Sequence, residues 1–165
     1  MFIFFIGIWA GLAAADDAQA PVFFGKSKEP VDITADKLDF DQKKNIAVFS
    51  GKVVARQGKT SLEADVLNIV FAEADQSLSE ITATGKEVVI KLQGKKALCQ
   101  KMYYNAVERK LVLTGNPSLD DGKNVVRGEE ITFFLDAERS VVKSGQQKRV
   151  TTTIFPGQRG GPGWQ

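Results

Sequence analysis

The sequence contains no histidine and a single cysteine among its 165 residues. Without histidine, the chain lacks the commonest general base, the commonest zinc ligand and any Ser–His or Cys–His pair that activates a nucleophile. One cysteine cannot form a disulfide within the chain, and Cys99 lies in an apolar segment, where we expect a small buried side chain. No segment resembles a nucleotide-binding loop. The usual machinery of catalysis and of nucleotide-driven work is therefore missing, and we predict neither an enzyme nor a cofactor.

An excess of one charge is also missing. The 22 basic and 20 acidic side chains give a formal net charge of +2 at pH 7. The basic residues are spread along the chain, whereas a nucleic-acid interface gathers them on one face or one helix. We therefore predict no nucleic-acid partner.

Only one long apolar run is present, and it spans residues 2–12. The run is followed by Ala13-Ala14-Ala15 and by Ala18-Gln19-Ala20, which fit the small-residue cleavage sites of secretory signal peptides. Residues 1–15 are fewer than the roughly 17–25 that a membrane-spanning helix needs, although no Lys or Arg precedes the run. We predict a signal peptide over residues 1–20, cleaved after Ala15 or Ala20, and hence an exported protein. A retained N-terminal membrane anchor is the alternative.

The rest of the chain is long enough for one domain with its own core. We expect a flexible lead-in over residues 21–29, a folded domain over residues 30–155 and a disordered tail over residues 156–165. The tail is rich in glycine and proline, which favours disorder.

Residues 30–155 contain a repeat. In four segments an apolar residue is followed three positions later by a charged residue, and five positions later by an apolar or aromatic one. The charged residues are Asp36, Asp65, Lys101 and Glu129. A polar turn and a second apolar strand then lead to a glycine in each unit, namely Gly51, Gly85, Gly115 and Gly145. Self-similarity with a period of about 30 residues indicates stacked supersecondary units.

Each unit has the pattern of strands. Apolar residues alternate over 47–53, 81–85 and 111–115, and β-branched and aromatic residues fill these runs. The five-residue step breaks the alternation by one, as a bulge or sharp bend does, so that both halves of a bent strand can face one interior. We therefore predict an all-β fold of rolled antiparallel sheets, with roughly 12–16 short strands from repeated hairpins.

An open stack of hairpins leaves unpaired backbone on its first and last strands, which favours pairing with another copy or a partner. The residues predicted at these edges are Val31, Ile33, Val150, Thr152 and Ile154.

Five motifs resemble the OstA-like family of periplasmic lipopolysaccharide-transport bridge proteins, also called the LptA family. They are Pro30-Val-Asp-Ile-Thr-Ala-Asp36, Phe49-Ser-Gly-Lys-Val53, Leu113-Thr-Gly-Asn116, Arg127-Gly-Glu-Glu-Ile-Thr-Phe133 and Lys148-Arg-Val-Thr-Thr152. The resemblance covers residues 30–155 and implies an open β-jellyroll, a periplasmic location and lipopolysaccharide, through its lipid A, as the ligand. It also implies that copies join end to end into one groove between an inner-membrane transporter subcomplex and an outer-membrane translocon.

The predicted lipid groove consists of interior apolar side chains, any of which could instead belong to an ordinary dry core. They are Val31, Ile33, Leu38, Phe49, Leu67, Ile69, Ile81, Ile90, Tyr103, Leu113, Ile131 and Phe133. Because Tyr103 and Tyr104 are adjacent in a strand, one faces inward, and we favour Tyr103.

The recurring carboxylates Asp36, Asp65 and Glu129 could in principle perform acid–base chemistry, including glycoside cleavage. Their recurrence at one repeat position favours a structural role at the bend, so we predict no catalytic and no metal-binding residue. Basic side chains could contact lipid phosphates, although most such residues are simply solvated. Three alternatives stay open: a membrane-anchored β-jellyroll partner of the inner-membrane transporter, a periplasmic scaffold that binds no lipid, and a glycan-modifying enzyme.

Overall fold

The computed structural model describes residues 29–146 and 149–154, which contain twelve strands and no helix. The strands are β1 (Asp32–Thr34), β2 (Lys37–Asp41), β3 (Ile46–Gln57), β4 (Thr60–Phe71), β5 (Leu78–Leu92), β6 (Lys95–Asn105), β7 (Lys110–Thr114), β8 (Ser118–Asp120), β9 (Val125–Arg127), β10 (Glu130–Phe134), β11 (Arg139–Lys143) and β12 (Thr151–Thr153). The all-β prediction is confirmed. The predicted signal peptide, residues 21–28 of the lead-in and the tail lie outside the described residues.

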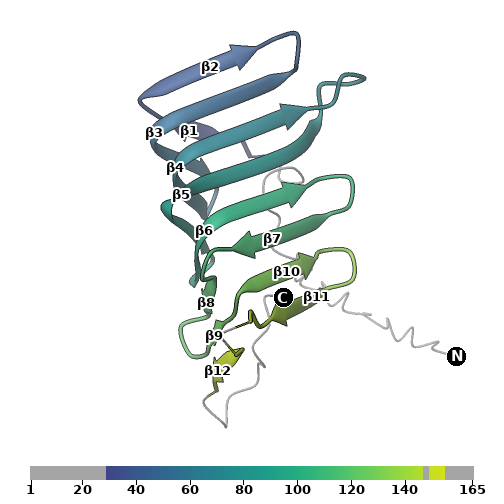
Figure 1. Ribbon diagram of the computed structural model, residues 1–165. Coiled ribbons are helices and arrows are strands. Elements are labelled where there is room, and N and C mark those ends of the chain that lie inside the picture. Colours follow the sequence, from purple (N-terminus) through teal and green to yellow (C-terminus); the bar gives the residue numbers. More distant parts are fainter. Residues whose placement is uncertain (1–28, 147–148, 155–165) are drawn as a thin grey trace, which may run out of the picture.

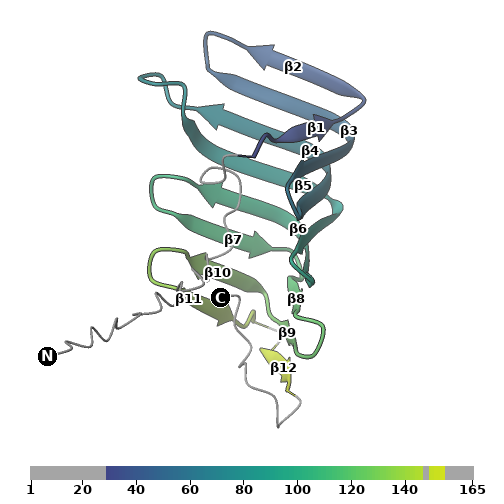
Figure 2. The same cartoon turned by 180° about the vertical axis from the view of Figure 1, so that it is seen from behind.

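The strands form one antiparallel sheet that is folded into two walls. The long strands β3 to β6 contribute one half to each wall. The first wall has the order β2-β3-β4-β5-β6-β7-β10-β11, and the second has the order β1-β3-β4-β5-β6-β8-β9-β12. Figure 1 shows the first wall stacked from β2 to β11, and Figure 2 shows the molecule from behind. Neither wall closes on itself, so the sheet is open at both ends.

The bends between the walls lie where the repeat predicts them. The β3–β4 register shifts between Ser50 and Val53, and the β5–β6 register shifts between Thr84 and Val88. At the first bend Gly51 has a φ of 81°, a conformation that costs a side-chain-bearing residue energy. The Asp36 amide donates a hydrogen bond of 2.9 Å to the Gly51 carbonyl. The repeated carboxylate–glycine pairs are thus structural bend elements.

One repeat position was assigned wrongly from the sequence. In the third unit the residue beside Gly115 is Gln100 and not Lys101, since the Gln100 amide donates a hydrogen bond of 3.1 Å to the Gly115 carbonyl. Glutamine breaks the charge pattern of the repeat, and the adjacent Lys101 fits that pattern although it lies one residue away from the bend position.

The core lies between the two walls. Directly opposite residues of antiparallel strands share a face, so the registers trace continuous apolar rows across each wall. The inner row of the first wall contains Leu38, Phe49, Leu67, Ala83, Met102, Leu113 and Ile131. The inner row of the second wall contains Ile33, Ala55, Leu62, Ile90, Ala97, Leu119 and Val126. Most of these side chains are buried in a single core cluster.

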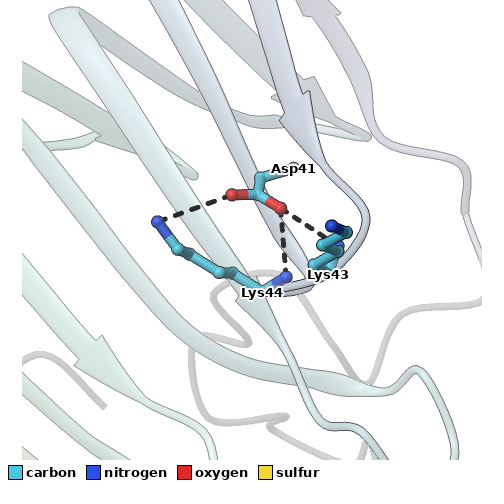
Figure 3. A network of polar contacts seen from close by, with 3 residues as sticks. All are labelled: Asp41, Lys43 and Lys44. Atoms are coloured by element: carbon cyan, nitrogen blue, oxygen red, sulfur yellow. Dashed lines mark hydrogen bonds and ion pairs between the residues drawn. The ribbon is translucent and has the colours of Figure 1, made fainter.

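Short polar turns join the strands at the edges of the walls. Between β2 and β3 the Asp41 carboxylate accepts hydrogen bonds from the amides of Lys43 (3.0 Å) and Lys44 (3.2 Å) (Figure 3). The Lys44 ammonium also lies 3.6 Å from the second carboxylate oxygen. The side chain thereby replaces backbone partners that the turn lacks, as Asp commonly does in turns.

Candidate functional site

An apolar pocket of about 370 Å³ lies between the walls, at the N-terminal end of the fold. Its volume is within the range of about 300–1,000 Å³ typical of small-molecule sites. It is lined by Glu29, Val31, Ile33, Ala55, Gln57, Leu67, Ile69, Phe71, Leu78 and Ile81. Only Glu29 and Gln57 of these are polar, and the side-chain Nε2 of Gln57 donates a hydrogen bond of 2.8 Å to the backbone carbonyl of Glu29. The pocket can therefore take an apolar group of ligand size.

The strands at this end place apolar side chains on an open inner face. β1 and β2 pair with β3 alone, so each presents an unpaired edge. Leu38 and Phe40 of β2 belong to the inner rows by register, yet they are 56% and 50% exposed. Val31 is 40% exposed beside the pocket. The apolar interior therefore continues to the very end of the molecule.

The pocket contains five of the predicted groove residues: Val31, Ile33, Leu67, Ile69 and Ile81. Phe49 packs partly buried against the core, and Leu38 lies on the exposed end strand. Four more predicted groove residues, Ile90, Leu113, Ile131 and Phe133, are at most 6% exposed in the core farther along the walls. Ala55, Phe71 and Leu78 also line the pocket but are not among the predicted groove residues. Ala55 and Phe71 lie in strand patterns of alternating apolar residues, which is a signal that could identify them.

The assignment of Tyr103 to the interior is wrong. Tyr103 lies opposite Thr82 and Val112 on the outer face, whereas Tyr104 is 3% exposed in the core. Desolvation in the core raises the pKa of the Tyr104 hydroxyl. Taking Lys101 instead of Gln100 as the bend residue shifts the alternation by one, and a shift of one residue exchanges the two faces of a strand.

Four strands, not two, form the ends of the walls. β1 and β12, which carry the predicted edge residues Ile33 and Thr152, each pair on one side only. Val31 lies beside β1, and Val150 and Ile154, which flank β12, are 41% and 54% exposed. The end strands β2 and β11 are not predictable from the sequence, because their hairpins have the same residue pattern as those of the interior units.

Within the described ranges, no group of three or more His, Cys, Asp or Glu side chains is placed to hold a metal ion. The bend carboxylates Asp36, Asp65 and Glu129 are exposed and lie in separate units of the repeat. Asp65 accepts a hydrogen bond of 2.9 Å from the Lys86 amide, which is again a structural contact at a bend.

Cys99 is a buried core residue, as the sequence predicts, and is 3% exposed. Desolvation raises the pKa of its thiol to about 12, so at pH 8 the reactive thiolate is roughly a thousandfold rarer than in the unfolded chain. We expect labelling by a thiol reagent at pH 8 to slow by at least that factor on folding, when native and urea-unfolded samples are compared. Because the folded pKa is the higher one, the associated stability is complete below about pH 8.5 and declines as the pH rises toward 12. Fast labelling of the native protein would contradict this burial.

The fold and the pocket define a class: an open, two-walled antiparallel β-roll whose apolar interior reaches the end of the molecule. The chain belongs to the family described as LptA/(LptD N-terminal domain) LPS transport protein, whose sequence model matches residues 32–139. This is a family of transport proteins and not of enzymes, in agreement with the sequence-based prediction.

Individual relatives agree with this assignment. The chain is 28% identical to the lipopolysaccharide export system protein LptA of Escherichia coli over 148 residues, which are 86% of this chain and 80% of that protein. It is 24% identical to the lipopolysaccharide export system protein LptH of Pseudomonas aeruginosa over 140 residues, which are 81% and 78% of the two chains. The crystal structure of LptH, the LptA-homologous periplasmic component of a lipopolysaccharide transport device, superposes with a TM-score of 0.67 at 22% identity. The superposition covers 78% of this chain and 96% of LptH and supports the fold.

In the part of the chain that the structure describes, no helix has the length and apolar character needed to cross a membrane.

Proposed function

We propose that the protein is an exported periplasmic carrier that binds lipopolysaccharide and shields the acyl chains of lipid A between its two walls. The observation that carries the proposal is the apolar pocket of about 370 Å³ at the open N-terminal end. Membership of a lipopolysaccharide-transport family and the names of the relatives support the choice of ligand. The proposed groove comprises the pocket residues and Phe49, and it extends to Ile90, Leu113, Ile131 and Phe133, which are buried in the core and contact lipid only when the walls part there.

The physical reason for such a carrier is the cost of exposing acyl chains to water. Each buried methylene contributes about 0.8 kcal/mol, so a fourteen-carbon chain gains on the order of 10 kcal/mol when it leaves water. Apolar contacts are non-directional, and a chain can therefore move along a trough without breaking specific bonds. The energy for net movement must come from a partner, which we propose to be an inner-membrane transporter subcomplex, with an outer-membrane translocon as the acceptor.

We further propose that copies assemble end to end. Each wall contains an even number of strands, eight in the orders given above. Alternating directions then make β11 of one copy antiparallel to β2 of the next, and β12 antiparallel to β1. Both walls can continue across the junction with antiparallel pairing, and both inner rows continue with them.

A photo-crosslinking series tests lipid binding. Benzoylphenylalanine, which keeps the phenyl ring and adds a photoreactive benzoyl group to it, replaces three phenylalanines in turn. They are Phe71 in the pocket, Phe133 on the inner face of β10, and Phe134, which lies on the outer face beside Lys110 and Arg139. We expect irradiation with lipopolysaccharide vesicles to give lipid adducts at Phe71 and Phe133, with at least about tenfold less at Phe134. Folded variants that give no adduct at either inner position, or equal adducts at all three, would refute the carrier function.

A further inference from the structure

The chain crosses between the walls repeatedly, so each wall ends in a row of hairpin turns. The turns of the first wall span residues 42–45, 72–77, 106–109 and 135–138, and those of the second wall span residues 58–59, 93–94 and 121–124. Acidic residues outnumber basic ones in the first row, whereas lysine predominates in the second. The two margins of the trough therefore differ in charge.

A hollow of about 780 Å³ lies on the second margin and contains four lysines. It is lined by Lys59, Lys91, Leu92, Gln93, Gly94, Lys95 and Lys96, with no acidic residue. We call Lys59, Lys91, Lys95 and Lys96 the lysine margin. They come from two neighbouring hairpins, the β3–β4 turn and the β5–β6 hairpin.

The lysine margin places like charges together. Lys91 lies directly opposite Lys96 in the β5–β6 ladder, and like charges in that position are destabilising. Lys91 forms an ion pair of 3.0 Å with Glu63. Among the residues that the structure describes, Lys59 and Lys96 have no ion-pair partner within 4 Å, although Asp120 lies opposite Lys96 in the β6–β8 ladder. An anion bound between these ammonium groups would relieve the repulsion.

The lysine margin adjoins the apolar pocket. Gln57 lines the pocket, and Lys59 follows two residues later in the β3–β4 turn. Ile90 and Leu92 belong to the core, while the neighbouring Lys91 points to the outer face of the same strand. An apolar site and a cationic site therefore lie on either side of one margin, an arrangement that suits an amphipathic ligand with an anionic head.

We propose that the lysine margin binds the phosphate groups of the lipid whose acyl chains occupy the pocket, an assignment that rests on the proposed carrier function. Ammonium–phosphate contacts are charge-assisted and stronger than neutral hydrogen bonds. Because lysine side chains are long and flexible, a phosphate can exchange one ammonium group for the next along the margin. The margin would orient the lipid with its head toward the second wall while its chains remain free to slide.

The test compares two lipids on three proteins. Lipid A with two phosphates and the same lipid with one phosphate are titrated into the wild type, into Lys59→Gln/Lys96→Gln and into the control Lys86→Gln/Lys101→Gln. The control removes the same charge from exposed bend lysines. We expect the wild type and the control to bind the bisphosphate about five- to tenfold more tightly than the monophosphate, and the margin variant to lose most of that preference. The preference should also shrink at high ionic strength.

The possible outcomes separate the two proposals. Equal affinity of the wild type for both lipids, or an unchanged preference in the margin variant, would overturn the margin assignment and leave the carrier function intact. A wild type that binds neither lipid would overturn both. A margin variant that loses binding to both lipids equally would also contradict the assignment, because the lysines would then act on the fold or the acyl site. Circular dichroism of each variant distinguishes these last two causes.

Discussion

Replacement of Gly51 by alanine is expected to lower the free energy of unfolding by about 3 kcal/mol, a large effect for the addition of one methyl group. A Cβ atom at this position would lie 2.8 Å from the Asp36 Cβ and 2.9 Å from its Cγ, which are closer than real contacts allow. The left-handed backbone adds about 1–2 kcal/mol for a residue with a side chain. The contact cannot relax without separating β2 from the first bend, so overpacking contributes a similar amount. The midpoint temperature of thermal unfolding should fall by roughly 10 °C.

The matched control is Gly94→Ala. Gly94 has nearly the same φ, 83° against 81°, but its added Cβ would meet no atom within 4 Å. We expect a cost of about 1–2 kcal/mol there, because only the backbone conformation is disfavoured. A second-site change, Asp36→Gly in the Gly51→Ala background, removes the crowding atoms and should restore part of the loss. Equal destabilisation by both alanine substitutions would show that backbone strain, and not the Asp36–Gly51 contact, determines the bend.

The same contact explains why the fold was predictable from the sequence. A carboxylate in one strand and a glycine in the next recur because each bend requires that close approach, as at Asp36–Gly51 and Asp65–Gly85. Sequence repetition therefore reports a repeated geometric requirement. Where Gln100 fills the position, the geometry is preserved while the charge pattern is lost. The alternation was then misplaced by one residue, and Tyr103 was assigned to the wrong face.

The pocket could be predicted only in part. Alternation identifies inward-facing side chains such as Ile33, Leu67 and Ile131, but it does not say where the walls stand apart and where they touch. Ile33 lines the pocket, while Ile131 is fully buried. That difference depends on the separation of β1 from β4 and β5, which are far apart in sequence. The lysine margin was missed for the same reason, because Lys59 and Lys96 come together only when two hairpins lie side by side.

The polarity of end-to-end assembly is expected to follow the charges of the end strands. On its outer face β2 carries Lys37, Asp39 and Asp41, and β11 carries Arg139 and Lys143. If the rows of the first wall continue across a junction, Asp41 lies opposite Arg139 and Lys37 lies opposite Lys143, while Asp39 lies diagonal to both Arg139 and Lys143. Three of these four charge contacts are attractive. Symmetric pairing of two copies through β2 would instead set the two Asp39 carboxylates directly opposite each other, which is destabilising. The charges thus favour β11 against β2, head to tail.

Reversal of one charge at either end should therefore weaken self-association, and combining the two variants should restore part of it. We expect Asp39→Lys alone and Arg139→Glu alone each to weaken assembly by about tenfold, equivalent to about 1.4 kcal/mol, in sedimentation velocity at low salt. In an equimolar mixture the two variants can alternate, so that every second junction is the wild-type one, and assembly should recover in part. High ionic strength should reduce all these differences. Head-to-head pairing makes a different prediction: Asp39→Lys would exchange one like-charge junction for another and leave association unchanged. Unchanged association of both single variants would therefore exclude the β11–β2 junction, even if the protein still binds lipid as a single copy.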